Sequence, residues 1–95
     1  DSNFPYIEPE LAEYIATRPW MKLNVLGIDS FSIDPRGSNS EAHRALLSRD
    51  ILILETAVNL KELKNYTGRK PFELHCVPVA YPGADAGQTR AYARL

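Results

Sequence analysis

The sequence contains little cysteine and no excess of basic charge, and each of these features excludes a class of protein. Its single cysteine, Cys76, excludes a disulfide within the chain and a cysteine-rich zinc site, and it suits the reducing cytoplasm, where we expect the protein to be found. Eleven Lys and Arg residues stand against twelve Asp and Glu residues, with no basic run, so we expect no nucleic-acid partner. No apolar run approaches the roughly 20 residues of a membrane-spanning helix, so we expect no membrane partner.

The composition that remains is typical of a small folded domain. Hydrophobic residues make up 44% of the 95 residues and charged residues 24%, which is the profile of a globular chain rather than a disordered one. A domain of this length buries a smaller share of its surface than a larger one, so its core is marginal. We therefore expect it to associate with a partner, and a homo-oligomer is one such association.

Helical and strand patterns alternate along the chain and predict an α/β fold. Pro9 suits a first helical position, and Leu11, Tyr14 and Ile15 form an apolar stripe that predicts a helix ending before Pro19. The remaining patterns predict a strand over residues 23–28, a helix over 39–49, a strand over 51–56, a helix over 59–66, and two antiparallel strands over 72–79 and 89–95. No linker or repeat interrupts these elements, so we predict no domain boundary.

The first strand–helix–strand stretch contains the candidate functional residues. Asp29 follows its first strand and Glu55 ends its second. Between them, the connecting loop contains Asp34, and the helix presents His43 toward the protein together with its apolar residues. Such a unit joins parallel strands, whose carboxyl ends meet at the edge of the sheet where ligands bind. We therefore expect these four side chains to converge.

His43 and Glu55 carry the sharpest chemical hypothesis. An imidazole nitrogen and a carboxylate oxygen are both ligands of Zn²⁺ and Mn²⁺, so the two side chains could bind one ion. The alternative is structural, because a histidine facing the core is often satisfied by hydrogen bonds and a glutamate at a strand end by a salt bridge. Asp29, Ser32 and Asp34 could orient a substrate or support the metal ligands, or could simply close loop turns.

Two weaker patterns accompany these residues. Arg36, Gly37 and Ser38 precede the predicted helix and could cradle an anion, and Ser38 with Glu41 fits a capping box. Cys76 has no neighbouring base, so we expect it to fill core space. The sequence has no nucleophile elbow, phosphate loop or dinucleotide fingerprint.

Three segments occur in order along the chain: GIDSFSIDP at residues 27–35, SEAHRALL at 40–47 and ILILE at 51–55. With Asn59 and Leu60 and the Pro-Gly-Ala-Asp-Ala turn at 82–86, they resemble the C-terminal half of the cyclase family of metal-dependent hydrolases. That family includes kynurenine formamidase, an arylformamidase, and isatin hydrolase. The resemblance implies a swivelling β/β/α fold, with a mixed sheet and flanking helices.

The same resemblance implies a chemistry and a set of ligands. It implies a bound Zn²⁺ or Mn²⁺ ion and hydrolysis of an amide or formamide bond in a small-molecule substrate by metal-activated water. The metal-binding positions of the family fall on His43 and Glu55, which are twelve residues apart. Asp29, Ser32 and Asp34 then become residues that support the metal ligands or contact the substrate.

One departure from the family limits the chain's own activity. The family's His-x-Gly-Thr-His-x-Asp-x-Pro motif, which supplies the other metal ligands and the general base, does not occur here. We therefore expect residues 1–95 to be the C-terminal portion of one cyclase-like domain, without a catalytic residue of its own and inactive without its N-terminal part. The alternative is a catalytically inactive module that keeps the fold and serves oligomerisation or partner binding. The presence of both His43 and Glu55 favours the enzyme, because a carboxylate that continues the apolar face of Ile51 and Ile53 is costly to bury.

Overall fold

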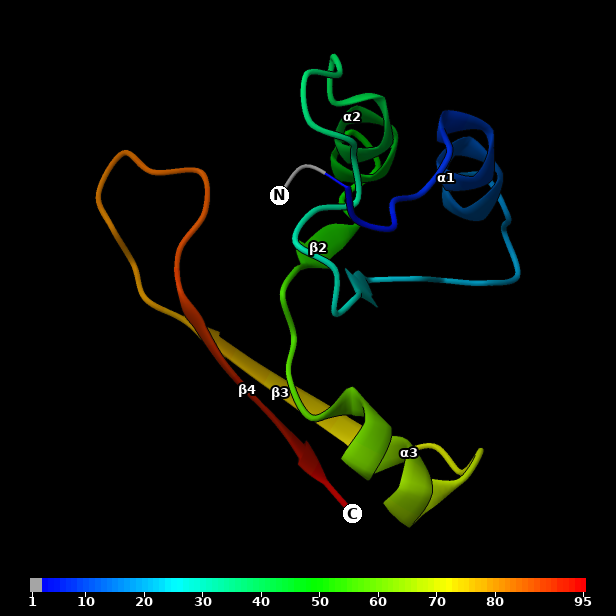
Figure 1. The fold of residues 1–95 in the computed structure, drawn as a ribbon, viewed down its shortest axis with the longest axis vertical. Coiled ribbons are helices and arrows are strands. Elements are labelled where there is room, and N and C mark those ends of the chain that lie inside the picture. Colours follow the sequence, from blue (N-terminus) through cyan, green and yellow to red (C-terminus); the bar gives the residue numbers. More distant parts are fainter. Residues whose placement is uncertain (1–2) are drawn as a thin grey trace. The chain divides into compact units, whose positions relative to one another are not determined.

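The computed structural model describes residues 3–95, which form two compact units with a boundary after Val58 (Figure 1). Unit 1 contains α1 (Pro9–Ala16), β1 (Val25–Gly27), α2 (Glu41–Leu47) and β2 (Leu52–Leu54). Unit 2 contains α3 (Leu60–Thr67), β3 (Glu73–Pro78) and β4 (Thr89–Arg94). The α/β class is confirmed, but the described strands form two separate two-stranded sheets instead of one mixed sheet. That residues 1–95 belong to a single domain stays a prediction.

Helix α1 begins at Pro9, as its sequence predicts, but it buries a different face. Ala12 is fully buried, whereas Leu11 and Tyr14 are each 49% exposed, so the predicted apolar stripe is wrong at two of its three residues. The helix packs against α2, where Ala42 is also fully buried. Small side chains on both helices allow their axes to approach closely, and larger ones at these positions would not fit.

The strand–helix–strand stretch has the predicted parallel arrangement. β1 pairs with β2 in the register Val25–Leu52, Leu26–Ile53 and Gly27–Leu54. Backbone pairing continues beyond the strands, because the Ile28 N–H donates to the Leu54 carbonyl at 2.9 Å and the Ala57 N–H donates to the Ile28 carbonyl at 3.0 Å. This pairing fixes the backbone on both sides of Glu55.

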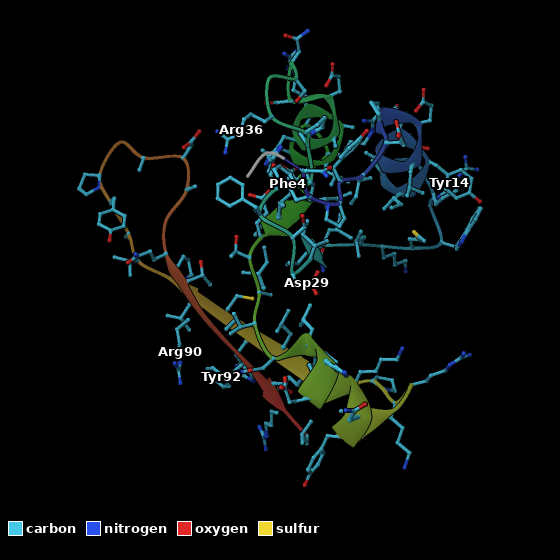
Figure 2. The ribbon with its side chains drawn as sticks, viewed as in Figure 1. Phe4, Tyr14, Asp29, Arg36, Arg90 and Tyr92 are labelled. Atoms are coloured by element: carbon cyan, nitrogen blue, oxygen red, sulfur yellow. The ribbon has the colours of Figure 1, made fainter. Side chains whose placement is uncertain are left out.

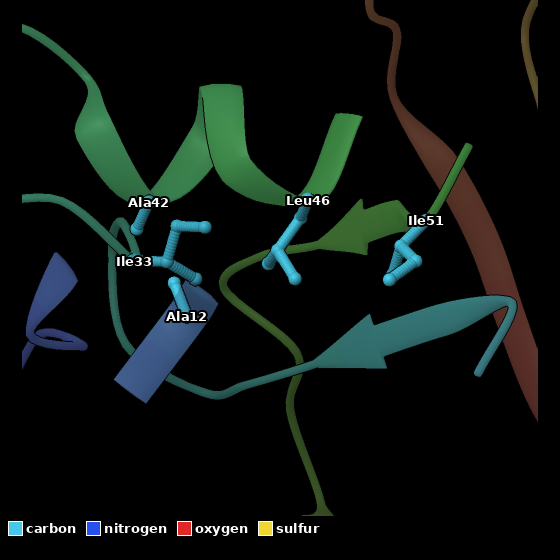
Figure 3. Close-up of a cluster of buried hydrophobic side chains, with 5 residues drawn as sticks. All are labelled: Ala12, Ile33, Ala42, Leu46 and Ile51. Atoms are coloured by element: carbon cyan, nitrogen blue, oxygen red, sulfur yellow. The ribbon is translucent and has the colours of Figure 1, made fainter. Parts of the chain in front are cut away.

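A small apolar core holds unit 1 together. Its buried side chains are Ala12, Ile33, Ala42, Leu46 and Ile51. Figure 3 shows Ala42 and Leu46 projecting from α2 toward Ile33 and Ala12. Ile33 belongs to the loop between β1 and α2, and its full burial contributes about 1.5–3 kcal/mol. The loop with the candidate functional residues is therefore anchored to the core.

Unit 2 contains the predicted antiparallel hairpin, paired from Glu73–Arg94 to Pro78–Thr89. Cys76 is exposed, so the expectation that it fills core space is wrong. The physical reason is that no described side chain of unit 2 is buried, which leaves no core for the thiol to enter. No helix in the described part of the chain is both long and apolar enough to cross a membrane.

Candidate functional site

Asp34, His43 and Glu55 form a continuous chain of polar contacts in unit 1. The Nδ1 atom of His43 lies 2.7 Å from Oδ2 of Asp34, and its Nε2 atom lies 3.2 Å from Oε2 of Glu55. Asp34 is 5% exposed, and His43 and Glu55 are 28% and 27% exposed. Each ring nitrogen therefore faces a carboxylate oxygen, one buried and one accessible to solvent.

Asp34 is the residue that organises this cluster. Its Oδ1 accepts a hydrogen bond from the Ala42 N–H at 2.9 Å, and its Oδ2 accepts one from the His43 N–H at 2.9 Å. The carboxylate thus caps the first turn of α2 from a loop position eight residues before Ala42. The same Oδ2 contacts the imidazole, so the orientation of the ring is coupled to the helix cap.

The predicted capping box of Ser38 and Glu41 is therefore wrong. Ser38 Oγ accepts a hydrogen bond from the Ser40 N–H at 3.2 Å, and Ser40 itself has a left-handed backbone with φ 58°. The helix begins after this turn, the Ser38 N–H donates to the Pro35 carbonyl at 3.2 Å, and Asp34 instead of Ser38 caps the first turn by accepting from the Ala42 and His43 N–H groups. A carboxylate near a helix N-terminus is also favoured by the helix dipole.

The environment of Asp34 favours its ionised form. Burial by itself would raise the pKa of the carboxyl group, but the hydrogen bonds from the backbone of His43 and Ala42 lower it. The hydrogen bond and the electrostatic attraction between the carboxylate and the His43 side chain lower it further, so the pKa of Asp34 lies below its ordinary value. Asp34 is consequently an anion that holds a proton on Nδ1 of the imidazole.

Hydrogen bonds to the loop between β1 and α2 hold the Glu55 side chain and the residue after it in place. Its Oε2 accepts a hydrogen bond from the N–H of Ile33 at 2.9 Å. The next residue, Thr56, has a left-handed backbone with φ 57° and donates its N–H to the carbonyl of Ser30 at 2.9 Å. A β-branched residue in this conformation costs about 1–3 kcal/mol, which the surrounding contacts must offset. The bend after β2 directs the Glu55 carboxylate toward His43.

The remaining predicted residues divide into one that joins the cluster and one that does not. Ser32 Oγ accepts a hydrogen bond from the Asp34 N–H at 3.1 Å, which closes a turn of the loop and helps to place the carboxylate. Asp29 is exposed (Figure 2), and the ion pairs found for His43 and Glu55 within residues 3–95 do not include it. The expected convergence of four side chains is thus a convergence of three, because a carboxylate without a polar partner stays in water.

A pocket of about 420 Å³ opens beside His43 and Asp34. Its other lining residues are Phe4, Phe31, Ser32, Pro35, Arg36, Gly37, Ser38 and Ser40. The rings of Phe4 and Phe31 pack edge to face, with their centres 5.7 Å apart. Sequence reasoning missed this aromatic pair, whose only local signal is Phe31, the one aromatic residue of a mostly polar loop.

The donor atoms of His43 and Glu55 fit part of a metal site. Two ligands that each lie about 2.0–2.2 Å from a tetrahedral ion are roughly 3.3–3.6 Å apart. The separation of 3.2 Å between Nε2 and Oε2 is close to this range. Asp34 on the opposite ring nitrogen is the kind of partner that orients a metal-binding imidazole and leaves a lone pair on Nε2. Within residues 3–95, however, no group of three or more His, Cys, Asp or Glu side chains is arranged to hold an ion.

Comparison with known proteins found relatives among the kynurenine formamidases. The chain is 34% identical over 94 residues to the kynurenine formamidase of Bordetella avium, 33% identical over 93 residues to that of Bordetella petrii, and 34% identical over 95 residues to that of Sphingopyxis alaskensis. No family model and no solved structure matches the chain. The matches cover 97–99% of this chain but only 41–42% of each relative. The chain is therefore similar, along nearly all of its length, to about two fifths of a kynurenine formamidase.

Proposed function

We propose that the chain is the C-terminal part of a cyclase-like, metal-dependent hydrolase that cleaves an amide or formamide bond. In this proposal His43 and Glu55 are two ligands of a Zn²⁺ or Mn²⁺ ion, and the N-terminal part supplies the other ligands and the general base. The observation that carries it is the pair Nε2 and Oε2, 3.2 Å apart, on an imidazole whose other nitrogen is held by Asp34. The partial similarity to kynurenine formamidases supports the type of reaction.

The residues of this chain would have distinct roles in such an enzyme. When bound, the ion supplies the Lewis acidity that activates a water molecule and polarises an amide carbonyl. Asp34 keeps the proton of His43 on Nδ1, so that Nε2 remains a ligand. The N–H of Ile33 holds one oxygen of Glu55 in place. Ser32 positions Asp34 through the loop backbone and lines the adjoining pocket.

Two features of the unit 1 surface support the idea that another part of the protein covers it. Leu52 is 61% exposed and Val58 is 77% exposed, although both side chains are apolar. Both edges of the β1–β2 pair are also without a further strand among the described residues. Exposed apolar groups and unpaired strand edges are features that a partner or another part of the same chain covers. A homo-oligomer would cover the same surface and stays a prediction.

The test compares metal binding in matched variants of the longest form of the protein that its source produces. We expect His43→Asn and Glu55→Gln each to lower the affinity for Zn²⁺ by at least roughly tenfold and to abolish formamide hydrolysis. The control is a second His–Glu pair in unit 2, in which Nε2 of His75 lies 2.5 Å from Oε1 of Glu73 without an aspartate behind the ring. His75→Asn and Glu73→Gln should leave metal content and turnover unchanged.

A second experiment uses the 95-residue chain alone. With only two ligands, it should bind Zn²⁺ weakly and hydrolyse no formamide, since a catalytic zinc site takes three protein ligands. Turnover by this chain would refute the division of the site into two parts. The competing hypothesis is a catalytically inactive module for oligomerisation or partner binding. That module would be favoured if the longest natural form contains no metal and if neither the His43 nor the Glu55 variant changes its Zn²⁺ affinity or its formamide hydrolysis.

A further inference from the structure

A second pocket lies in unit 2, at the end of α3. It has a volume of about 350 Å³ and is lined by residues of α3 and of the segment that leads to β3: Leu60, Leu63, Lys64, Thr67, Gly68, Arg69, Lys70 and Phe72. This volume falls near the lower end of the range of small-ligand sites, about 300–1,000 Å³. All of these residues belong to unit 2, so the pocket is formed within one unit.

Positive charge is concentrated around this pocket. Residues 61–70 contain four of the chain's eleven Lys and Arg residues and one acidic residue, Glu62, although the formal net charge of the chain is −1. Three of these cations line the pocket, Lys64, Arg69 and Lys70, and no acidic side chain lines it. All three are exposed, and none forms an ion pair or a side-chain hydrogen bond with a residue that the structure describes. The pocket therefore offers several positive charges to an anion.

The end of α3 does not use these cations. Lys and Arg side chains near a helix C-terminus can bind its last carbonyl groups. Here the Leu63 carbonyl accepts from Oγ1 of Thr67 at 3.0 Å. The Lys64 carbonyl accepts from the Gly68 N–H at 2.7 Å, and the Thr67 carbonyl accepts from the Lys70 N–H at 3.0 Å. Because these carbonyls are satisfied by other donors, the ammonium and guanidinium groups stay available to a ligand.

The rest of the pocket lining is largely apolar. Leu60, Leu63 and Phe72 contribute to it, and Leu60 and Phe72 are 38% and 40% exposed. A ligand that covers these side chains gains about 25 cal/mol for each Å² of apolar surface removed from water. The pocket thus combines unpaired cations with accessible apolar surface, which suits a ligand that has an anionic end and an apolar body.

We infer that this pocket of unit 2 binds a small, soluble phosphate monoester with an apolar body. A phosphate monoester carries a charge of about −1.5 to −2 at pH 7 and has three acceptor oxygens, so it can contact several cations at once. The guanidinium of Arg69 can donate two parallel hydrogen bonds to it, and Lys64 and Lys70 add point charges. The inference goes beyond the proposed function and does not depend on it, since neither the metal nor unit 1 takes part.

The test is a calorimetric titration of the longest natural form with phenyl phosphate, in the presence of EDTA so that no metal ion binds the phosphate. We expect phenyl phosphate to bind roughly fivefold more tightly than inorganic phosphate, because its ring covers apolar surface, and phenol to show no measurable binding. Arg69→Gln should weaken the binding of phenyl phosphate roughly five- to tenfold, and Arg69→Lys should restore only part of it.

Arg90→Gln is the matched control. It removes the same charge from an exposed position on β4 of the same unit, outside the pocket (Figure 2), and should change the affinity less than twofold. Equal losses in the Arg69 and Arg90 variants would overturn the inference, because they would indicate unspecific attraction of an anion. Equal affinities for phenyl phosphate and inorganic phosphate would exclude a role for the apolar lining.

A lipid headgroup is another source of the same chemistry. Sedimentation with vesicles of phosphatidylcholine and phosphatidic acid distinguishes the two, because protein that binds these vesicles but not phenyl phosphate would refute a soluble ligand. The titration also separates this inference from the proposed function. Phenyl phosphate binding without formamide hydrolysis would refute the proposed function alone, and formamide hydrolysis without phenyl phosphate binding would refute this inference alone.

Discussion

Replacing Asp34 with asparagine tests how the loop, α2 and the imidazole are joined. The carboxylate is 5% exposed and accepts three hydrogen bonds, one from Ala42 and two from His43. The side-chain oxygen of asparagine can still accept the hydrogen bond from the Ala42 N–H. Its NH₂ group, however, then faces the backbone N–H and the Nδ1 atom of His43, to which it cannot be an acceptor. Two hydrogen bonds to a charged acceptor are lost, each contributing about 1.5–3 kcal/mol. Burying a neutral amide costs less than burying a charge, so we expect unit 1 to lose about 2–4 kcal/mol in free energy of unfolding.

The pH dependence of this loss has a definite sign. The pKa of Asp34 in the folded chain lies below its ordinary value of 3.8, because the hydrogen bonds from His43 and Ala42 and the His43 charge outweigh the effect of burial. The carboxylate therefore stabilises the folded state at pH values above 3.8, and this stabilisation disappears as the pH falls below 3.8 through the folded-state pKa. The difference between the wild-type chain and Asp34→Asn should be largest near neutral pH and shrink in acid.

Urea unfolding followed by far-UV circular dichroism and by the Ala42 amide signal measures both effects. Asp29→Asn is the matched control, because it makes the same chemical change on an exposed carboxylate and should alter stability by about 0.5 kcal/mol or less. An Asp34 variant within about 0.5 kcal/mol of the wild-type chain would refute the capping role. A loss that stays constant below pH 3.8 would refute the ionic origin of the effect.

Two further substitutions test packing in each unit. Leu46→Ala removes a fully buried side chain and should cost about 2–5 kcal/mol in urea unfolding, whereas Leu47→Ala, at a side chain that is 49% exposed, should cost about 1 kcal/mol or less. Gly87→Ala would place a Cβ atom 2.5 Å from the Val79 carbonyl oxygen and should destabilise the hairpin by about 1–3 kcal/mol, seen as lost β3–β4 cross-strand NMR contacts. Gly27→Ala meets nothing closer than 3.8 Å, so equal losses at both glycines would contradict the steric reasoning.

Local patterns were sufficient to predict most secondary structure. Pro9 at the start of α1 and the apolar patterns of the strands predict elements within a few residues of their bounds, because turns and helix ends depend on neighbouring residues. The strand–helix–strand pattern also predicts parallel pairing, since such a crossover joins parallel strands. Which face of α1 is buried was not predictable in this way. That depends on the approach of α2, where small residues face each other and leave Leu11 and Tyr14 outside.

For the candidate site, the sequence by itself determined which side chains are present and that His43 and Glu55 end up near one edge of a parallel pair. The tertiary structure decided the rest, because loop side chains point where distant contacts hold them. Burial of Ile33 anchors the loop, so Asp34 reaches the start of α2 and the imidazole, while Asp29 remains in solvent. The same loop path leaves Arg36 exposed on the lining of a pocket, with no ion pair to any residue that the structure describes. Sequence chemistry thus singled out His43 and Glu55 as the proposed ligand pair, and long-range packing placed Asp34 behind the imidazole.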